Sequence, residues 1–264
     1  MTAPPRTRSA WSVTLSVWKA LFLREALARM FGRRSAMLWL FLEPLAHLAF
    51  MVFVFTVLRV RHVGGIDTPQ WLLVGMLSFF LFRRVATQGA AAVGANLALF
   101  SYRQVRPVDT VLVRCALEGV LMLLISAVVL AGAALLGVPL RADAPLTVLA
   151  ALGGLWLLGL GYGLFVSVVT ELAPEIGNLI GMLMMPLYLI SGVIFPLSAI
   201  PYPWREWIML NPVAHGVEGV RAGVASFYHA VPELDLGYLW LSALVLLFLG
   251  LALQVRHQRR LAAL

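Results

Sequence analysis

The chain has 264 residues, of which 61% are hydrophobic and only 12% are charged, with a formal net charge of +8. A soluble globular domain is typically about 45–50% apolar and about 25% charged. The composition therefore excludes a soluble enzyme, a disordered chain and a disulfide-stapled scaffold, and it predicts an all-α membrane protein that crosses the bilayer several times.

The first segment, residues 11–32, is expected to form a helix that does not cross the membrane. Charged residues interrupt it, so its longest uncharged run is too short for a span. Apolar residues recur at three- and four-residue spacing and fall on one face: Trp11, Leu15, Trp18 and Phe22. This pattern predicts an amphipathic interface helix on the cytoplasmic leaflet. A basic leader without fixed structure is the alternative.

Six apolar segments follow that are long enough to cross roughly 30 Å of hydrocarbon. The expected transmembrane helices cover residues 35–58, 70–96, 110–136, 145–170, 176–195 and 236–255. Small residues at four-residue spacing in 87–96 allow close helix packing at the end of the second span. An even number of spans places both termini on one side of the membrane.

Charged residues inside the first two spans are candidates for a functional site. Arg83 and Arg84 lie past the middle of the second span, on its cytoplasmic half. Charges at this depth usually face a cavity or a partner. Adjacent helical residues point about 100° apart, so the two arginines are expected to have different partners. Glu43 and His47 share one face of the first span, and Glu43 is a candidate partner for one arginine; structural ion pairing alone is the alternative.

Residues 97–106 leave the membrane as a short element that carries both aromatic and basic side chains. Phe100, Tyr102, Arg103 and Arg106 make it a candidate docking point for another protein on the cytoplasmic side. An ordinary connecting loop is the alternative. The other cytoplasmic connection, residues 171–177, is predicted to be a tight acidic turn.

Between spans five and six, residues 198–227 are predicted to form a re-entrant hairpin. Pro201, Pro203 and Pro212 prevent one continuous helix and leave two short helical pieces. Non-helical backbone at membrane depth is tolerated only where it packs in protein or lines a cavity. The pattern therefore favours a hairpin beside a translocation path; an outer loop that caps the bundle is the alternative.

Aromatic side chains are further candidates for lining a translocation path. Candidates near the outer half are Phe79, Tyr188, Phe195, Tyr202 and Trp204, and Tyr162 is a deeper one. Aromatic residues also anchor helices at the membrane–water interface, so lipid-facing anchors are the alternative.

The distribution of positive charge predicts the orientation. Of the 20 lysine and arginine residues, 13 fall near the predicted ends on the side of the two termini, five on the other side, and two within a span. Positive residues accumulate on the cytoplasmic side, so both termini are expected to be cytoplasmic. This arrangement accounts for the basic charge without nucleic acid binding.

The sequence contains no recognisable motif for catalysis, nucleotide binding or metal binding. It contains no G-x-x-x-x-G-K-[S/T] loop for nucleotide phosphates and no H-E-x-x-H metal motif, and no metal site is expected. His215 and Glu218 are three residues apart, a spacing that arises often by chance. An enzyme that acts within the membrane would need an acid–base pair at one depth, and the sequence offers no convincing one.

Three stretches resemble one transporter family: PQWLLVGMLSFFLFRR at 69–84, ANLALFSYRQVRPVDTVLVRCALE at 95–118 and SGVIFPLSAIPYPWREWIMLNPVAHGVEGVR at 191–221. The chain resembles the membrane subunit, or permease, of type-2 ABC exporters. The third stretch is the general signature of these exporters, and the first two are similar to the capsular polysaccharide export branch, the KpsM-like proteins. The resemblance covers nearly the whole chain.

The resemblance implies a single transmembrane permease domain over 1–264, in the bacterial inner membrane, that works as a homodimer. It implies a separate nucleotide-binding ATPase subunit that holds ATP and Mg²⁺, with no cofactor in this chain. Residues 97–106 match the coupling helix, and the implied ATPase contacts are Leu97, Phe100, Ser101, Tyr102, Arg103, Arg106, Glu171 and Glu175. The implied substrate is a lipid-linked polysaccharide, passed to a periplasmic co-polymerase-type adaptor and an outer-membrane export protein. O-antigen, teichoic acid or a small hydrophobic compound are alternative substrates.

Overall fold

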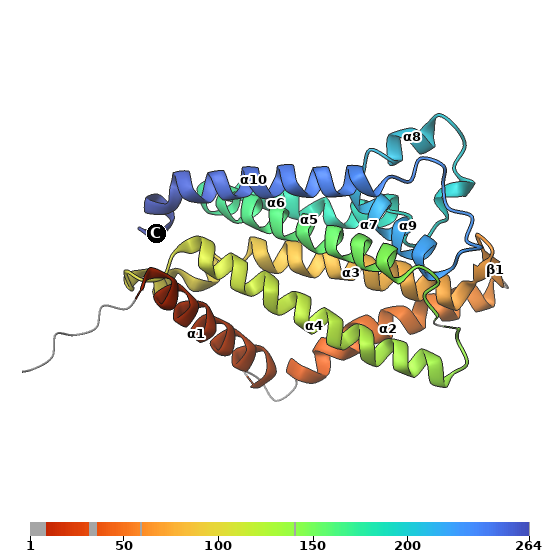
Figure 1. Cartoon of the computed structure of the whole chain (residues 1–264), viewed down its shortest axis with the longest axis horizontal. Helices are drawn as coiled ribbons and strands as arrows, with labels where there is room; N and C mark the ends of the chain where they lie inside the picture. Colours follow the sequence, from red (N-terminus) through yellow and green to blue (C-terminus); the bar gives the residue numbers. More distant parts are fainter. Residues whose placement is uncertain (1–8, 32–35, 59, 140, 264) are drawn as a thin grey trace, which may run out of the picture.

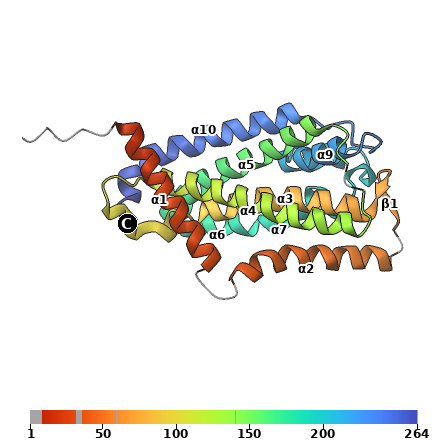
Figure 2. The same ribbon diagram turned by 60° about the horizontal axis from the view of Figure 1, so that its bottom comes forward.

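Helices that run along one long axis form most of the structure, with α1 lying across them at one end (Figures 1 and 2). The computed structural model describes residues 9–31, 36–58, 60–139 and 141–263. Arg6, Arg8, Arg33, Arg34 and Arg59, which entered the charge count, and the boundary residues 32 and 35 lie outside the described residues.

The first two helices agree closely with the predicted segments. Helix α1 covers Ala10–Phe31 and α2 covers Ala36–Val57. Pro44 lies inside α2, where it removes one backbone hydrogen bond. After α2, a two-residue antiparallel pairing of β1 (His62–Val63) with β2 (Ile66–Asp67) reverses the chain toward α3.

The second predicted span is too long at its C-terminal end. Helix α3 covers Thr68–Ala90 and does not continue to residue 96. A separate 3₁₀ helix, η1, covers Gly94–Ser101. Asn96 has non-helical backbone angles, and its side-chain amide donates to the Ala92 carbonyl, which replaces a regular helix bond. The compact element predicted at 97–106 thus begins three residues earlier and ends as a helix at Ser101.

Three helices of the described residues are long and apolar enough to cross a membrane: α4 (Pro107–Leu135), α5 (Pro145–Leu172) and α10 (Leu236–Leu261). Two shorter apolar stretches cover Phe41–Val57 and Pro174–Ile190. Proline in the first turn begins α3, α4, α5, α6 and α9, because its missing N–H has no helical partner there.

The fifth predicted segment, 176–195, is not one continuous helix. Helix α6 covers Pro174–Met182 and α7 covers Met184–Ile190, with a break at Leu183. Pro186 has no N–H to bond the carbonyl four residues earlier, which is that of Met182, so the helix breaks there. Only Ala173 separates α5 from α6, in agreement with a tight turn.

The segment predicted as a hairpin contains short helices joined by turns. They are the 3₁₀ helix η2 (Leu197–Ala199), α8 (Trp204–Ile208) and α9 (Pro212–Val224). Asn211 caps α9, since its side-chain oxygen accepts from the Val213 N–H at 3.0 Å. Helix α8 lies at the end of the bundle opposite the C-terminus, and α9 lies between α8 and α3 (Figure 1).

Helix α5 is central because glycines let its neighbours approach closely. A Cβ atom on Gly161 would lie 2.7 Å from the backbone nitrogen of Leu247 in α10. One on Gly163 would lie 2.9 Å from Cα of Gly89 in α3. Backbone contact of this kind is typical of helices packed in membranes.

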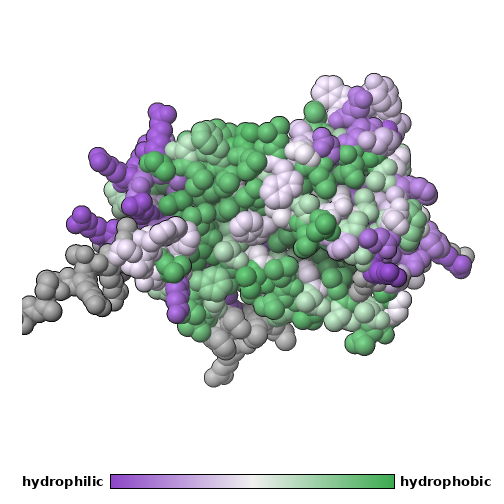
Figure 3. Space-filling view, in the orientation of Figure 1, coloured by the Kyte–Doolittle hydropathy of each residue, from purple (hydrophilic) through white to green (hydrophobic). Residues whose placement is uncertain are grey.

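The surface has the polarity of a membrane protein. Hydrophobic residues cover the middle of the molecule, and hydrophilic residues gather at its two ends (Figure 3). The apolar surface includes α2 and α10, where Phe53 is 64% exposed and Phe248 is 72% exposed. Exposing an apolar surface of this kind to water costs free energy, whereas contact with the hydrocarbon of a membrane does not.

Candidate functional site

The two arginines of α3 have different partners. Arg83 Nη2 lies 3.9 Å from Glu43 Oε1 of α2, and both side chains are partly exposed. Arg84 Nε lies 3.1 Å from Glu118 Oε2 of α4, and Glu118 is fully buried. The divergence of adjacent helical positions thus sends one arginine to a pair near the surface and the other into the bundle.

Glu118 is a residue that the sequence reasoning missed. It also lies 2.6 Å from Arg29 Nη1 of α1, so one buried carboxylate holds two guanidinium groups. Arg29 in addition donates to the Gln88 side chain of α3. A lone acidic residue within the apolar segment 110–136 was the available signal, because a carboxylate at that depth needs a cationic partner.

Two further contacts attach α1 to the end of the bundle that carries η1. Trp18 Nε1 donates to Asp109 Oδ1 of α4 at 2.8 Å. Asn96 of η1 donates to Glu25 Oε1 at 3.3 Å and accepts from Arg24. The helix predicted to lie on the leaflet is therefore bonded both to α4 and to the element predicted to dock a partner. Figure 2 shows α1 crossing in front of α4.

His47 and two predicted path residues form a cluster between α2, α3 and α7. His47 Nε2 and Tyr188 Oη are joined by a hydrogen bond of 3.0 Å. The Phe79 ring lies 5.0 Å from the Tyr188 ring, centroid to centroid, and is completely buried. Phe79 thus supports Tyr188 and has no surface of its own to offer a substrate.

Two cavities meet at His47 and Arg83. One, of about 420 Å³, lies toward α6 and α7 and is lined by His47, Arg83, Gly181, Met182, Met184, Met185 and Tyr188. The other, of about 160 Å³, lies toward α4 and is lined by Glu43, Pro44, His47, Phe80, Arg83, Arg84, Thr87, Gln88 and Met122. Both linings include the Arg83 guanidinium and the His47 imidazole, and the smaller cavity also includes the Arg84 guanidinium and the Glu43 carboxylate. The excess of cationic groups makes this region suited to hold an anionic group.

Of the remaining path candidates, Tyr162 joins this cluster through Phe82, whose ring centroid lies 6.1 Å from that of Phe79, and the other three lie apart from it. Tyr162 packs against Phe82 at 6.2 Å between ring centroids, and its hydroxyl donates to the Ile180 carbonyl at 3.3 Å. Phe195, Tyr202 and Trp204 lie on the segment from α7 to α8 and are 59%, 70% and 66% exposed. The predicted residues thus divide into an inner group and an outer, exposed group.

A buried charged cluster attaches α9 to the rest of the outer end. Arg221 is completely buried, and its Cζ lies 3.8 Å from the centroid of the Trp71 ring. It donates to the Gly192 carbonyl at 2.7 Å and to Glu218 Oε1 at 2.9 Å. Tyr228 Oη donates to Glu218 Oε2 at 2.9 Å. The sequence reasoning counted Arg221 only as an outer-side charge and did not find this role.

His215 and Glu218 are occupied by structural contacts. His215 Nε2 lies 2.7 Å from the Met209 carbonyl, and its Nδ1 accepts from the Asp235 N–H at 3.0 Å. Glu218 bonds Arg221 and Tyr228, as described above. Both side chains therefore hold the backbone and neighbouring side chains around α9 in place.

The predicted docking element presents several side chains to solvent. Tyr102 is 65% exposed, Arg103 and Arg106 are exposed, and Phe100 is buried beneath them. Leu97 is half-buried and Ser101 is exposed; the Ser101 hydroxyl donates to the Ala98 carbonyl at 3.0 Å. A Cβ atom on Gly94 would lie 2.5 Å from Glu171 Oε1, so Glu171 lies over the start of η1, while Glu175 is exposed in the first turn of α6.

Comparison with known proteins gives consistent matches over most of the chain. The ABC-2 type transporter family matches residues 16–224. The polysialic acid transport protein KpsM of Escherichia coli is 34% identical over 246 residues, which is 93% of this chain and 95% of that protein. The capsule polysaccharide export inner-membrane protein CtrC of Neisseria meningitidis serogroup A is 30% identical, over 91% and 90% of the two chains. BexB of Haemophilus influenzae, named in the same way, is 28% identical, over 90% and 89%.

The family match covers more than half of the chain, and it includes both arginines of α3 and the whole of α9. The relatives align over nine-tenths or so of their own lengths, so the likeness extends to the full architecture and not to one motif. The chain is therefore a membrane protein of the ABC-2 type transporter family.

Proposed function

We propose that this chain is the membrane subunit of an ATP-driven exporter that moves a lipid-linked capsular polysaccharide from the cytoplasm across the bacterial inner membrane. The observation that carries the proposal is the pair of cavities that share Arg83 and His47. The proposal is also supported by sequence similarity. The chain is similar over 93% of its length to a polysialic acid transport protein and over 91% to a capsule export protein.

The transmembrane arrangement belongs to the same proposal. Helices α2, α3, α4, α5, α10 and the pair α6–α7 supply six crossings, and both termini lie in the cytoplasm. The segment 197–224 is the re-entrant hairpin at the periplasmic end. Its support is the buried ion pair of Arg221 with Glu218, since a charge pair without water contact suits a segment packed inside the membrane-embedded protein.

Arg83 is the proposed contact for the anionic part of the substrate. Its side chain keeps 46% of its surface exposed, and its partner Glu43 is 3.9 Å away, too far for a strong hydrogen bond. A guanidinium remains protonated and binds phosphate or carboxylate oxygens in a bidentate manner. Arg84 is engaged by buried Glu118 and is proposed to hold helices together.

The aromatic path candidates are proposed to guide the sugar polymer in two places. Tyr188 lines the inner cavity, where Phe79 supports its ring, and Tyr162 packs deeper in the bundle. Phe195, Tyr202 and Trp204 present exposed rings at the outer end. Stacking on sugar faces depends little on the order of the sugars, which suits a polymer that moves.

The partners are proposed from the exposed surfaces. Apolar side chains of α2 and of α6–α7 remain exposed, including Phe53 at 64% and Met182 at 72%, and a second copy of the chain would cover them. A separate ATPase would bind ATP and Mg²⁺ and contact Tyr102, Arg103 and Arg106. A periplasmic adaptor and an outer-membrane export protein would receive the polymer.

The proposal is tested by deleting the gene in the bacterium that carries it and comparing surface and intracellular polysaccharide. We expect capsule to disappear from the surface while polymer accumulates inside, and the intact gene to restore it. Normal capsule would contradict the proposal. Loss of O-antigen or teichoic acid with normal capsule would favour that polymer as the substrate.

The need for a separate ATPase is tested with the purified chain. In nanodiscs without a partner, it is expected to hydrolyse no ATP above the rate of empty nanodiscs. Reconstitution with the ATPase that co-purifies with it is expected to give hydrolysis. Robust hydrolysis by the chain alone would contradict the division of labour.

A further inference from the structure

An apolar cavity of about 360 Å³ lies where α3, α4, α5 and α9 meet. It adjoins the smaller of the two cavities that share Arg83, because Met122 lines both, but it contains neither arginine. Its size falls in the range of about 300–1,000 Å³ that is typical of small-molecule sites. Apart from Ser78 and Ser126, all of the side chains that line it are apolar. The Ser78 hydroxyl already donates to the Val74 carbonyl at 2.7 Å, so its proton is not available to a ligand.

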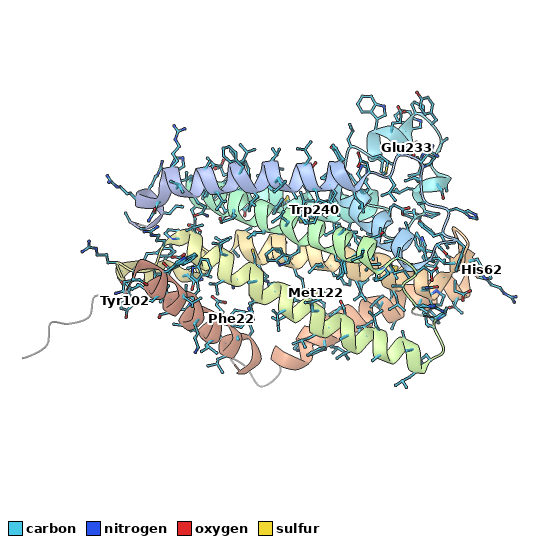
Figure 4. All side chains as sticks on the ribbon, viewed as in Figure 1. Phe22, His62, Tyr102, Met122, Glu233 and Trp240 are labelled. Carbon is cyan, nitrogen blue, oxygen red and sulfur yellow. The ribbon has the colours of Figure 1, made fainter. Side chains whose placement is uncertain are left out.

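The cavity has a buried floor and an exposed mouth. Val74, Leu77 and Val220 line it with at most 7% of their surfaces exposed. Leu123, on the outward side of α4, is 64% exposed, and Ala127 one turn later is also exposed. The mouth thus opens beside α4. Met122, which also lines the cavity, lies near the middle of α4 and is labelled in Figure 4. The surface at the middle of the molecule is mostly apolar (Figure 3).

An apolar cavity excludes water because water finds no hydrogen-bonding partner in it. The material that faces this mouth in a membrane is hydrocarbon, so the chemistry of the lining selects an acyl chain. A polar ligand would lose its hydration without compensation.

The rim adds a charge that fits a phospholipid. Arg141, which is exposed, directly precedes Ala142 of the cavity lining at the end of the bundle that also carries β1. The nearby Asp143 carboxylate is engaged, since Oδ2 accepts from the Ser226 N–H at 2.9 Å and from the Ser226 hydroxyl at 2.8 Å. Arg141 also interacts electrostatically with Asp143, but its exposed guanidinium, next in the chain to the cavity lining, can still contact an anionic group.

We propose that this cavity binds one acyl chain of a bilayer phospholipid, with the lipid phosphate at Arg141. Assignment to the outer leaflet rests on the orientation in the proposed function; the acyl-chain site itself does not. Val220 and Val224 of α9 form one wall, and the start of α5 is bonded to the end of α9 by Ala144 N–H donating to the Gly223 carbonyl at 2.9 Å. The bound chain thus lies between α4 and the joined α5–α9 unit.

The test uses the full chain in nanodiscs of phosphatidylethanolamine with a minor share of phosphatidylglycerol that carries a photoreactive diazirine on its acyl chain. After illumination, labelled peptides are mapped by mass spectrometry. We expect label at the buried residues Val74, Leu77 and Val220, in addition to the label that any lipid-facing residue such as Phe248 receives. Label confined to exposed residues would overturn the proposal.

Two variants of adjacent residues make the test specific. Ala127→Trp fills the mouth and is expected to abolish label at Val74 and Val220, whereas Val128→Trp, at an exposed position outside the lining, is expected to leave it unchanged. Arg141→Gln, which leaves the cavity intact, is expected to lower the same label. Equal labelling in Ala127→Trp and Val128→Trp would overturn the proposal, as would label that appears only when lipid-linked polysaccharide is added. The labelling experiment does not measure transport. A negative result in the export assay of the proposed function would therefore not change its interpretation.

Discussion

Arg84 Nε lies 3.1 Å from Oε2 of Glu118, a carboxylate with no exposed surface. Arg29 reaches the other carboxylate oxygen at 2.6 Å, so three helices, α1, α3 and α4, meet at one buried negative charge. Arg83, the preceding residue of α3, remains partly exposed beside two cavities. One pair of neighbouring arginines thus combines a structural position with an accessible one.

Glu118→Gln is expected to destabilise the protein strongly. It removes the negative charge between two guanidinium groups, and loss of one partner of a buried pair typically costs about 3–5 kcal/mol. The measurement is thermal unfolding in detergent together with protein abundance in the membrane. Glu43→Gln is the matched control, because the Glu43 side chain is 67% exposed and an exposed pair contributes about 0–1 kcal/mol. Equal effects of the two substitutions would contradict the assignment.

Arg83→Gln and Arg84→Gln are expected to fail in different ways. Arg83→Gln should reduce surface polysaccharide at normal protein abundance, because it removes a cation from both cavities. Arg84→Gln should reduce abundance, because it leaves Glu118 with one partner fewer. Surface polysaccharide is quantified against the amount of membrane-inserted protein in each strain. Unimpaired export in Arg83→Gln would exclude it as the substrate contact.

Tyr102→Ala combined with Arg103→Glu is expected to uncouple ATP hydrolysis from export and to leave membrane insertion intact. Both side chains are exposed at the end of η1, so the change removes a docking contact without disturbing the core. Export and hydrolysis are measured in parallel in the reconstituted complex. Arg259→Glu, an exposed change of the same charge in the last turn of α10, serves as the control. Normal export by the double variant would refute the coupling role.

Cysteine substitutions are expected to separate the outer aromatic residues from the inner ones. Trp204→Cys and Tyr202→Cys should crosslink to a polymer stalled in export, because both positions are exposed at the outer end. Phe79→Cys should remain unreactive, since that ring is completely buried. Phe248→Cys, on the apolar surface of α10, should react with lipid-phase reagents instead. The same lipid-phase pattern at residues 202 and 204 would argue for membrane anchors.

Acid is expected to loosen α8 from the loop before α10. Arg205 Nη2 donates to Glu233 Oε1 at 2.7 Å, and this bond lowers the pKa of Glu233 from its ordinary value of 4.5. A lowered pKa in the folded state stabilises it above pH 4.5, and this contribution is lost as pH falls through the lowered pKa. The protection factors of the amides of residues 204–208, which are corrected for the intrinsic exchange rate at each pH, should therefore fall in acid, and Glu233→Gln should remove that pH dependence. If the pH dependence of protection were unchanged in Glu233→Gln, a titrating group other than Glu233 would be responsible for it.

Apolar runs and prolines predicted most of the helices, because both act locally. Residues 11–32 and 35–58 differ from α1 and α2 by one residue at each end. The break of α3 after Ala90 depends on a side-chain bond from Asn96, and this bond cannot be read from hydrophobicity. Pro186 did signal the break between α6 and α7, but a long apolar run concealed it.

The candidate site was predicted less completely, because its partners come from distant parts of the chain. Glu43 was a candidate partner for an arginine since both lie in neighbouring spans, and the structure places it 3.9 Å from Arg83. Glu118 lies 34 residues after Arg84 and 89 after Arg29, and only the packing of three helices brings them together. Arg221 illustrates the same limit, since Trp71 is 150 residues away.

The contacts of Arg221 also imply an order of assembly during synthesis. Trp71, Gly192 and Val193, which surround its guanidinium, all precede it in the chain. Segments made earlier are available to fold first as a chain leaves the ribosome. When residue 221 emerges, its acceptors are therefore already made, and Tyr228 completes the cluster seven residues later through Glu218. Premature entry of α9 into the bilayer would place the Arg221–Glu218 pair in lipid without its carbonyl and tryptophan contacts, so this pair favours docking of the helix only after the preceding helices are in place.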